Sequence, residues 1–151
     1  MENLNSVTEE LKDRANSADN PKLKMWMNKA IALLNEMQAR GVSPKDIDPE
    51  LKVLRRQLDG DTRYEQIRSF YGMLLDYCRK KLNLVPPKYY QNQWMGLGMM
   101  IFGIPFGFMF SSSFDNFAFI GIGLPIGLSL GIAIGTEKDK KAKAEGRQLN
   151  I

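Results

Sequence analysis

Two long apolar runs, residues 94–110 and 117–135, constrain this chain more than any other feature of its sequence. Neither run contains Lys, Arg, Asp, Glu, Asn or Gln, and the short polar break Ser111–Asn116 separates them. A helix needs about 17 to 25 apolar residues to cross the roughly 30 Å hydrocarbon core of a bilayer. Because each run reaches that length and the break is too short for a domain, the sequence predicts a transmembrane hairpin of two antiparallel helices, residues 93–110 and 117–135.

Basic residues flank the hairpin on both sides, and the break between the helices has none. The flanking residues are Lys80, Lys81, Lys88, Lys138, Lys140, Lys141, Lys143 and Arg147. Cytoplasmic loops carry the excess of Lys and Arg in membrane proteins. We therefore expect a multi-pass membrane protein with both termini in the cytoplasm. The N-terminal residues lack a basic segment followed by an apolar one, so no cleavable signal is expected.

Aromatic residues stand at the predicted ends of both spans. Trp and Tyr prefer the headgroup level, where a ring can be apolar on one side and wet on the other. Tyr89, Tyr90 and Trp94 are predicted at the cytoplasmic interface, and Phe114 and Phe117 at the other. Pro86 and Pro87 cannot continue a helix, which indicates a stiff linker over residues 86–92.

Glycines recur every four residues in the second run and place one side-chain-free face along the helix. The set is Gly123, Gly127, Gly131 and Gly135, and Gly103 and Gly107 do the same in the first run. In lipid, such faces allow helix backbones to approach closely, so packing contacts replace the missing hydrophobic drive. The face could join the two helices of one hairpin or join separate protomers. Pro105 and Pro125 predict a bend in each span.

Residues 21–85 have the periodicity of a small helical bundle. Asn20-Pro21 predicts a helix start and Gly41 its end, a second helix is expected over Pro49–Leu58 closed by Gly60, and the pattern Thr62-x-x-Glu65 opens a helix over residues 63–82. Residues 1–20 are a polar segment with one short helix possible over Val7–Ala15. Residues 136–151 are expected to form a basic cytoplasmic tail. The fold class is therefore all-α, a cytoplasmic bundle followed by a hairpin.

The apolar faces of the bundle are rich in Met and aromatic side chains. Trp26, Met27, Phe70 and Tyr71 are either part of the bundle core or, in a sharper interpretation, a docking surface for a partner. A bundle of this size has a small hydrophobic core and marginal stability, so contacts with a membrane or a partner would stabilise it.

The glycine run and the segment after it resemble a known group. Gly121–Leu149 combines Gly-x-Gly-x-x-x-Gly-x-x-x-Gly-x-x-x-Gly with Asp-Lys-Lys-Ala-Lys-Ala-Glu-Gly-Arg-Gln-Leu. This is similar to the C-terminal hairpin of small bacterial glycine-zipper membrane proteins. The resemblance is confined to the C-terminal part of the chain and leaves the bundle unaccounted for. It implies a bacterial inner-membrane location and no activity.

The sequence offers no catalytic, cofactor-binding or metal-binding set. The chain has one cysteine, Cys78, and no histidine, which excludes an internal disulfide and any His-dependent site. Asp115 could bind a cation, but a capping role together with Asn116 is favoured. The charges of the N-terminal part are interleaved in sign, and most of the basic excess behind the net charge of +4 lies beside the predicted hairpin. Because there is no basic stripe, a nucleic-acid partner is not expected.

Three functional interpretations follow. The favoured one is a non-enzymatic scaffold, in which the bundle is tethered to the membrane and meets a protein partner. The alternative is a glycine-zipper oligomer that forms a membrane assembly or pore. A pore is less favoured, because Ser129 is the only polar residue in the spans that could line a water-filled path. An enzyme acting on lipid would need an acid, a base or a nucleophile near the interface, and no small-molecule substrate is indicated.

Overall fold

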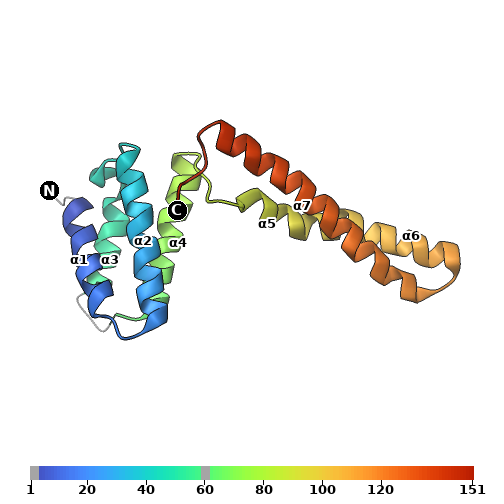
Figure 1. Cartoon of the computed structure of the whole chain (residues 1–151), viewed down its shortest axis with the longest axis horizontal. Helices are drawn as coiled ribbons and strands as arrows, with labels where there is room; N and C mark the ends of the chain where they lie inside the picture. The colour runs from blue at the N-terminus through green and yellow to red at the C-terminus, as the bar shows by residue number, and fades with distance from the viewer. Residues whose placement is uncertain (1–3, 59–61) are drawn as a thin grey trace. The chain divides into compact units, whose positions relative to one another are not determined.

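A computed structural model of the chain describes residues 4–58 and 62–151. Every named element is a helix, which confirms the expected all-α class. The chain divides into two compact units, and Figure 1 identifies the helices of each. The first unit runs to Leu84 and also includes Leu149–Ile151, and the second is Val85–Gln148.

Within the described residues, the first unit is a bundle of four α-helices and one short 3₁₀ helix. They are α1 (Leu4–Ser17), α2 (Pro21–Ala39), η1 (Pro44–Ile47), α3 (Asp48–Leu58) and α4 (Tyr64–Lys81). α2 begins as predicted, because Asn20 Oδ1 accepts from the backbone N–H groups of Lys22 (3.0 Å) and Leu23 (3.4 Å). It ends as predicted at Gly41, whose φ of 77° permits the Val42 N–H to donate to Met37 O (3.1 Å). The predicted end at Gly60 lies outside the described residues.

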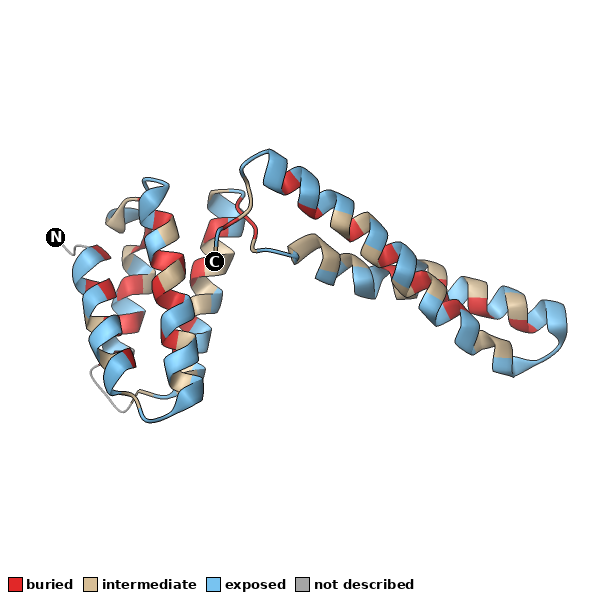
Figure 2. Cartoon of the chain, in the orientation of Figure 1, coloured by how far each residue is buried: buried red, intermediate tan, exposed pale blue. Residues whose placement is uncertain are grey.

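The core of this unit draws on all four α-helices, and Figure 2 shows its buried residues along their facing sides. The largest fully buried side chains are Leu11, Met27, Leu33, Leu34, Met37, Ile47, Leu51, Leu54, Leu58, Ile67, Phe70 and Leu74. Burial of aliphatic and aromatic side chains is the main favourable term in such a bundle.

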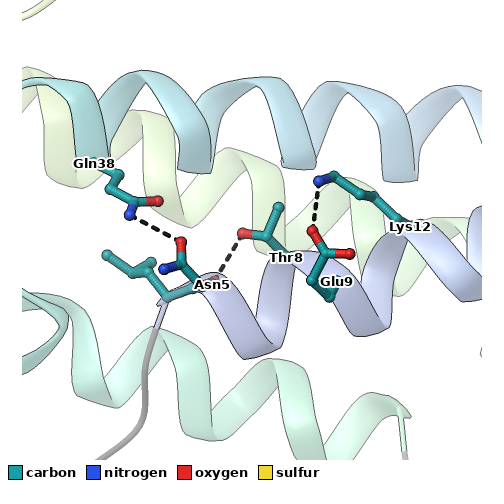
Figure 3. A network of polar contacts seen from close by, with 6 residues as sticks. Asn5, Thr8, Glu9, Lys12 and Gln38 are labelled. Atoms are coloured by element: carbon teal, nitrogen blue, oxygen red, sulfur yellow. Dashed lines mark hydrogen bonds and ion pairs between the residues drawn. The ribbon is translucent and has the colours of Figure 1, made fainter.

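α1 belongs to the bundle, although the sequence predicts a polar segment over residues 1–20 and a bundle that starts at residue 21. Its buried face is Leu4, Val7, Leu11 and Ala15, with spacings of three and four. The amide of Gln38 donates to Asn5 Oδ1 (2.9 Å), which ties α1 to α2 (Figure 3). Arg14 also donates to Leu58 O (2.8 Å) at the end of α3. The bundle therefore includes α1.

The last residues of the described chain complete this same unit. Leu149 is 1% exposed within its core, and Leu84 is buried there too. Both the backbone N–H and the side-chain amide of Asn150 donate to Glu36 Oε1, each at 3.3 Å. Residues 149–151, expected as part of a basic tail, are thus a piece of the bundle.

The second unit is a helical hairpin. Its first arm is the continuous helix Tyr89–Phe114, made of α5 (Tyr89–Gly98), the π-helical segment η2 (Met99–Gly103) and α6 (Ile104–Phe114). Its second arm is Phe117–Ala144, made of η3 (Phe117–Phe119) and α7 (Ile120–Ala144).

Both arms extend beyond their predicted bounds of 93–110 and 117–135. The first arm starts inside the predicted linker 86–92 and continues through Ser111–Ser113, so only two residues, Asp115 and Asn116, form the turn. The second arm continues nine residues past Gly135, because nothing in Thr136–Ala144 breaks a helix. Both helices therefore continue into polar residues at their ends, which hydropathy alone does not predict.

The two prolines affect their helices differently. Before Pro105, the Ile104 N–H donates to Met99 O, the five-residue spacing of a π-helical turn. Proline lacks an N–H and crowds the carbonyl four residues earlier, which accounts for a change of hydrogen-bond register at this point. Pro125 instead lies inside an uninterrupted α-helix, where the Ser129 hydroxyl donates to Pro125 O (2.8 Å).

Candidate membrane hairpin and its polar base

The hairpin is apolar on its outside. In the most apolar 18 residues of each arm, only 22% and 17% of the residues are buried. The exposed large side chains include Met100, Ile101, Ile104, Phe108, Met109, Ile122, Leu124 and Leu130. A water-soluble helix pair turns such side chains toward its partner. In this pair, the large apolar side chains point away from the partner helix.

Glycines fill the contact between the arms. An added Cβ at Gly123 or Gly127 would lie less than 3.0 Å from backbone atoms of the facing arm, at Gly107 and Gly103 respectively. A Cβ at Gly131 would meet Trp94, and one at Gly135 would meet Gln91. Helix α7 therefore packs against the first arm backbone to backbone along this glycine face. The contact lies within one hairpin.

Gly98 belongs to the same contact and was missed by the sequence analysis. Its Cβ would lie less than 3.0 Å from Gly127 O and from Gly131 Cα. The signal was present in the sequence, since Gly98, Gly103 and Gly107 are spaced five and four residues apart, but the five-residue step departs from the strict period of four. The π-helical segment over Met99–Gly103 supplies the additional residue that brings Gly98 back onto the face.

Two other glycines of the hairpin have no such neighbours. Beyond the adjoining backbone of its own helix, no atom lies within 4 Å of a Cβ built at Gly96 or at Gly121. These positions share the helices and the apolar surroundings of the contact glycines, and they offer matched controls for substitution.

The predicted interface aromatics gather near the two ends of the hairpin. Tyr89 and Tyr90 make an edge-to-face contact with ring centroids 5.2 Å apart, and the Lys138 ammonium lies 5.2 Å from the Trp94 ring centroid. At the turn, Phe114 packs on Phe119 at 4.9 Å and Phe117 is 81% exposed.

The turn itself is closed by the two residues that the sequence singled out. Asp115 takes a left-handed conformation (φ 48°) after α6, and the Asn116 N–H donates to Ser111 O (3.1 Å). The Asn116 side chain accepts from the Ala118 N–H (2.9 Å). Asn116 caps the second arm as expected. Asp115, which was expected to share that role, instead ends the helix before it.

Asp139 is the polar residue that the sequence analysis missed at the other end. Its two carboxylate oxygens accept from the backbone N–H groups of Tyr90 (3.0 Å) and Gln91 (2.9 Å) at the start of α5. A negative charge is favoured there because the first N–H groups of a helix have no partner within it. The local cap residue, Lys88, cannot supply such an acceptor. Asp139 caps α5 from the other arm, a pairing that no local sequence pattern reveals.

The arms are also joined just beyond this cap. The Val85 N–H donates to Arg147 O (2.9 Å), and Val85 pairs with Gln148 in a single parallel bridge. Gly146, with φ 69°, lets the Arg147 N–H donate to Ala142 O (2.8 Å) and ends α7. Hydrogen bonds to the Tyr90 and Glu145 side chains raise the pKa of the Arg147 guanidinium.

A pocket of about 450 Å³ opens at this polar base. Its lining residues are Pro87, Lys88, Gln91, Thr136, Asp139, Lys140, Lys143 and Gln148. Three lysines and one aspartate make the lining net positive. Lys88 holds a left-handed conformation (φ 60°) that side chains rarely adopt.

The residues suggested for partner docking are divided between core and surface. Met27 and Phe70 are 1% and 0% exposed, so they pack inside the bundle and present no surface. Trp26 and Tyr71 are half-buried, with ring centroids 5.7 Å apart. The Trp26 ring also lies 4.6 Å from the Lys29 ammonium and 5.6 Å from the Arg68 guanidinium.

Comparisons with protein-family models, with curated proteins and with solved structures find no match to this chain. The resemblance to glycine-zipper proteins therefore rests on the glycine spacing and the segment after it.

Proposed function

We propose that this protein is a non-enzymatic membrane anchor and scaffold, in which a glycine-zipper hairpin holds a helical bundle at the cytoplasmic face of a bacterial inner membrane. One observation carries the proposal: the hairpin directs its large apolar side chains outward and packs through glycines. Lipid is the solvent that suits this arrangement, because it rewards apolar exteriors and leaves close packing as the drive for helix association.

The dimensions agree with a bilayer. The stretch from Trp94 to Phe114 rises about 31 Å as a helix, close to the roughly 30 Å hydrocarbon core. Its ends coincide with the Trp94–Lys138 contact and with the Phe114–Phe119 pair. Aromatic and basic side chains favour the two headgroup regions.

Two arguments favour both ends of the hairpin on one side. The first is the excess of lysine beside the arms and its absence from the turn. The second is the core of the bundle, which holds both Leu84, before the hairpin, and Leu149, after it. A chain that leaves and rejoins one folded unit must cross the bilayer an even number of times.

The bundle supplies the scaffold. Trp26 and Tyr71, bordered by Lys29 and Arg68, form the aromatic and basic patch that we assign to a protein partner. Trp, Tyr and Arg are enriched at the energetically important centres of interfaces. Self-association through the glycine face is less favoured, because that face is consumed inside each hairpin.

Thiol labelling of single-cysteine variants tests the membrane arrangement. In a Cys78→Ala background, Ser112→Cys lies at the turn and Ser17→Cys lies in the bundle, and both positions are exposed. A membrane-impermeant maleimide should label Ser112→Cys from outside spheroplasts and Ser17→Cys only after lysis. Labelling of both from the same side, or recovery of the protein in the soluble fraction, would overturn the proposal.

A further inference from the structure

The pocket at the base of the hairpin has the features of an anion site. Lys140 is engaged by Glu137 (2.8 Å), whereas no ion pair in the described part of the chain involves Lys88 or Lys143. Lys88 directly precedes the first arm and Lys143 lies in the second arm, and both line the same pocket. Two uncompensated ammonium groups converging on one cavity favour a negatively charged occupant.

The carboxylate in the pocket does not cancel this preference. Both Asp139 oxygens accept backbone N–H bonds from α5, and the positive end of that helix faces them. Its charge is therefore directed toward the helix, and the lining keeps a net charge of +2 from three lysines and one aspartate. Gln91 and Gln148 add amide groups that can donate to an oxyanion.

The surroundings of the pocket indicate which kind of anion would bind there. Gln91 lines it, and Trp94 lies one helical turn further along α5, where the exposed apolar surface begins. On the proposed membrane location, a molecule with its phosphate in this pocket has apolar helix surface directly beside it. An anionic phospholipid has that combination, with a phosphodiester headgroup and acyl chains.

We propose that the pocket bounded by Lys88 and Lys143 binds the headgroup phosphate of an anionic phospholipid. This inference rests on the proposed membrane function. The phosphate contacts the Lys88 and Lys143 ammonium groups, and the acyl chains lie along the exposed face of the hairpin. The site distinguishes anionic from zwitterionic lipids by charge.

Quenching of Trp94 by brominated lipids tests the proposal in the full-length protein. The chain has two tryptophans, so Trp26→Phe leaves Trp94 as the only one. The protein is reconstituted in phosphatidylcholine vesicles containing phosphatidylglycerol, with bromine on the acyl chains of one lipid or the other. The ratio of the two quenching curves gives the preference of the site for the anionic lipid.

We expect phosphatidylglycerol to be preferred, and the preference to fall about fivefold for Lys143→Gln and by a similar further factor when Lys88→Gln is added, since each lysine near an anionic surface contributes about that much. Lys141→Gln is the matched control. It removes the same charge two residues away, where the side chain is 76% exposed and lies outside the pocket. An equal loss in Lys141→Gln would overturn the proposal in favour of general surface attraction.

Three further outcomes distinguish failure of the lipid site from failure of the proposed membrane function. Equal quenching by both lipids in the unsubstituted lysine background would overturn the lipid site while leaving the hairpin in the bilayer. Absence of quenching by either lipid would overturn the membrane function itself. Inorganic phosphate, compared with chloride at equal ionic strength, should not displace phosphatidylglycerol selectively. Selective displacement would assign the pocket to soluble phosphate and overturn the lipid assignment.

Discussion

Asp139 brings a carboxylate to two helix N-terminal amides that have no acceptor within their own helix. Replacing it with Ala should destabilise the hairpin by about 1 to 2 kcal/mol, the usual range for a lost cap with a favourable charge. Hydrogen exchange at the Tyr90 and Gln91 amides, measured in detergent, should accelerate.

Two substitutions control for this effect. Asn has one acceptor oxygen where Asp has two, so Asp139→Asn should keep one of the two amides protected and lose the protection of the other. Glu137→Ala removes an exposed carboxylate from the same helix and should leave both amides protected. If Asp139→Ala exchanged as slowly as the unmodified protein, the cap would contribute nothing to the stability of α5.

The thiol of Cys78 should make the unfolding free energy of the bundle depend on pH. Burial raises the pKa of the Cys78 thiol from 9.0 to about 11, outweighing the smaller lowering effect of Arg40. The folded bundle therefore holds this proton more tightly than the unfolded chain. The resulting stability is fully present below pH 9 and is lost as the pH rises toward 11. It amounts to no more than about 3 kcal/mol, because one pKa unit corresponds to about 1.4 kcal/mol.

Denaturant unfolding of the bundle from pH 8 to pH 11 should reveal this loss. Lysine and tyrosine side chains also titrate in this range, so the measurement is the difference between the protein and Cys78→Ala. The unmodified protein should lose more unfolding free energy than the variant. Parallel curves would mean that the thiol is not shielded from water in the folded bundle.

At the level of the helices, the glycine face sets how closely the arms of the hairpin approach. Gly127→Ala places a methyl group less than 3.0 Å from backbone atoms of the facing arm. The helices must separate, and overpacking of this kind costs about 1 to 3 kcal/mol. Insertion should persist, because alanine is no less apolar than glycine.

Gly121→Ala is the control, because its Cβ meets open space on the same helix. Both substitutions improve helix propensity by a similar amount, so the difference between them isolates the contact. Unfolding of each variant in mixed detergent measures the cost. Equal stability of the two variants would exclude a close contact at Gly127.

The helices differed in how far the sequence alone could locate them. The start of α2 at Asn20-Pro21 and its end at Gly41 were predictable, since capping depends on residues within a few positions of each other. The cap of α4 was displaced by one residue from the predicted Thr62, because Gln66 Oε1 accepts from the Arg63 N–H (2.9 Å). α1 was not predicted as part of the bundle, because its four buried apolar side chains lie in an otherwise polar segment.

The candidate site was predictable in part, for the same reason. The glycine face follows a local period and was anticipated, apart from Gly98, which required knowledge of the π-helical segment. The Asp139 cap and the pocket at Lys88 and Lys143 join residues about fifty positions apart. Their pairing depends on the register of the two arms, which the turn and the glycines determine together.

For the whole molecule, the return of the chain to the bundle is the feature with the widest effect. Leu149 is buried in a core formed otherwise by residues before the hairpin. Leu149→Ala should lower the unfolding free energy of the bundle by about 2 to 5 kcal/mol, as for other buried leucines. The fluorescence of Trp26 in a Trp94→Phe background reports this transition. Leu130→Ala, which removes an exposed leucine from the hairpin, should leave it unchanged.

That same return fixes an order of events during synthesis. Residue 149 is synthesised after both arms of the hairpin, so the core of the bundle is completed only once the whole hairpin has been made. On the proposed membrane arrangement, a hairpin that crossed the bilayer only once would separate Leu149 from the bundle and leave a gap in its core. On that arrangement, we expect a chain with the wrong topology to have an incomplete core and a bundle that unfolds more readily.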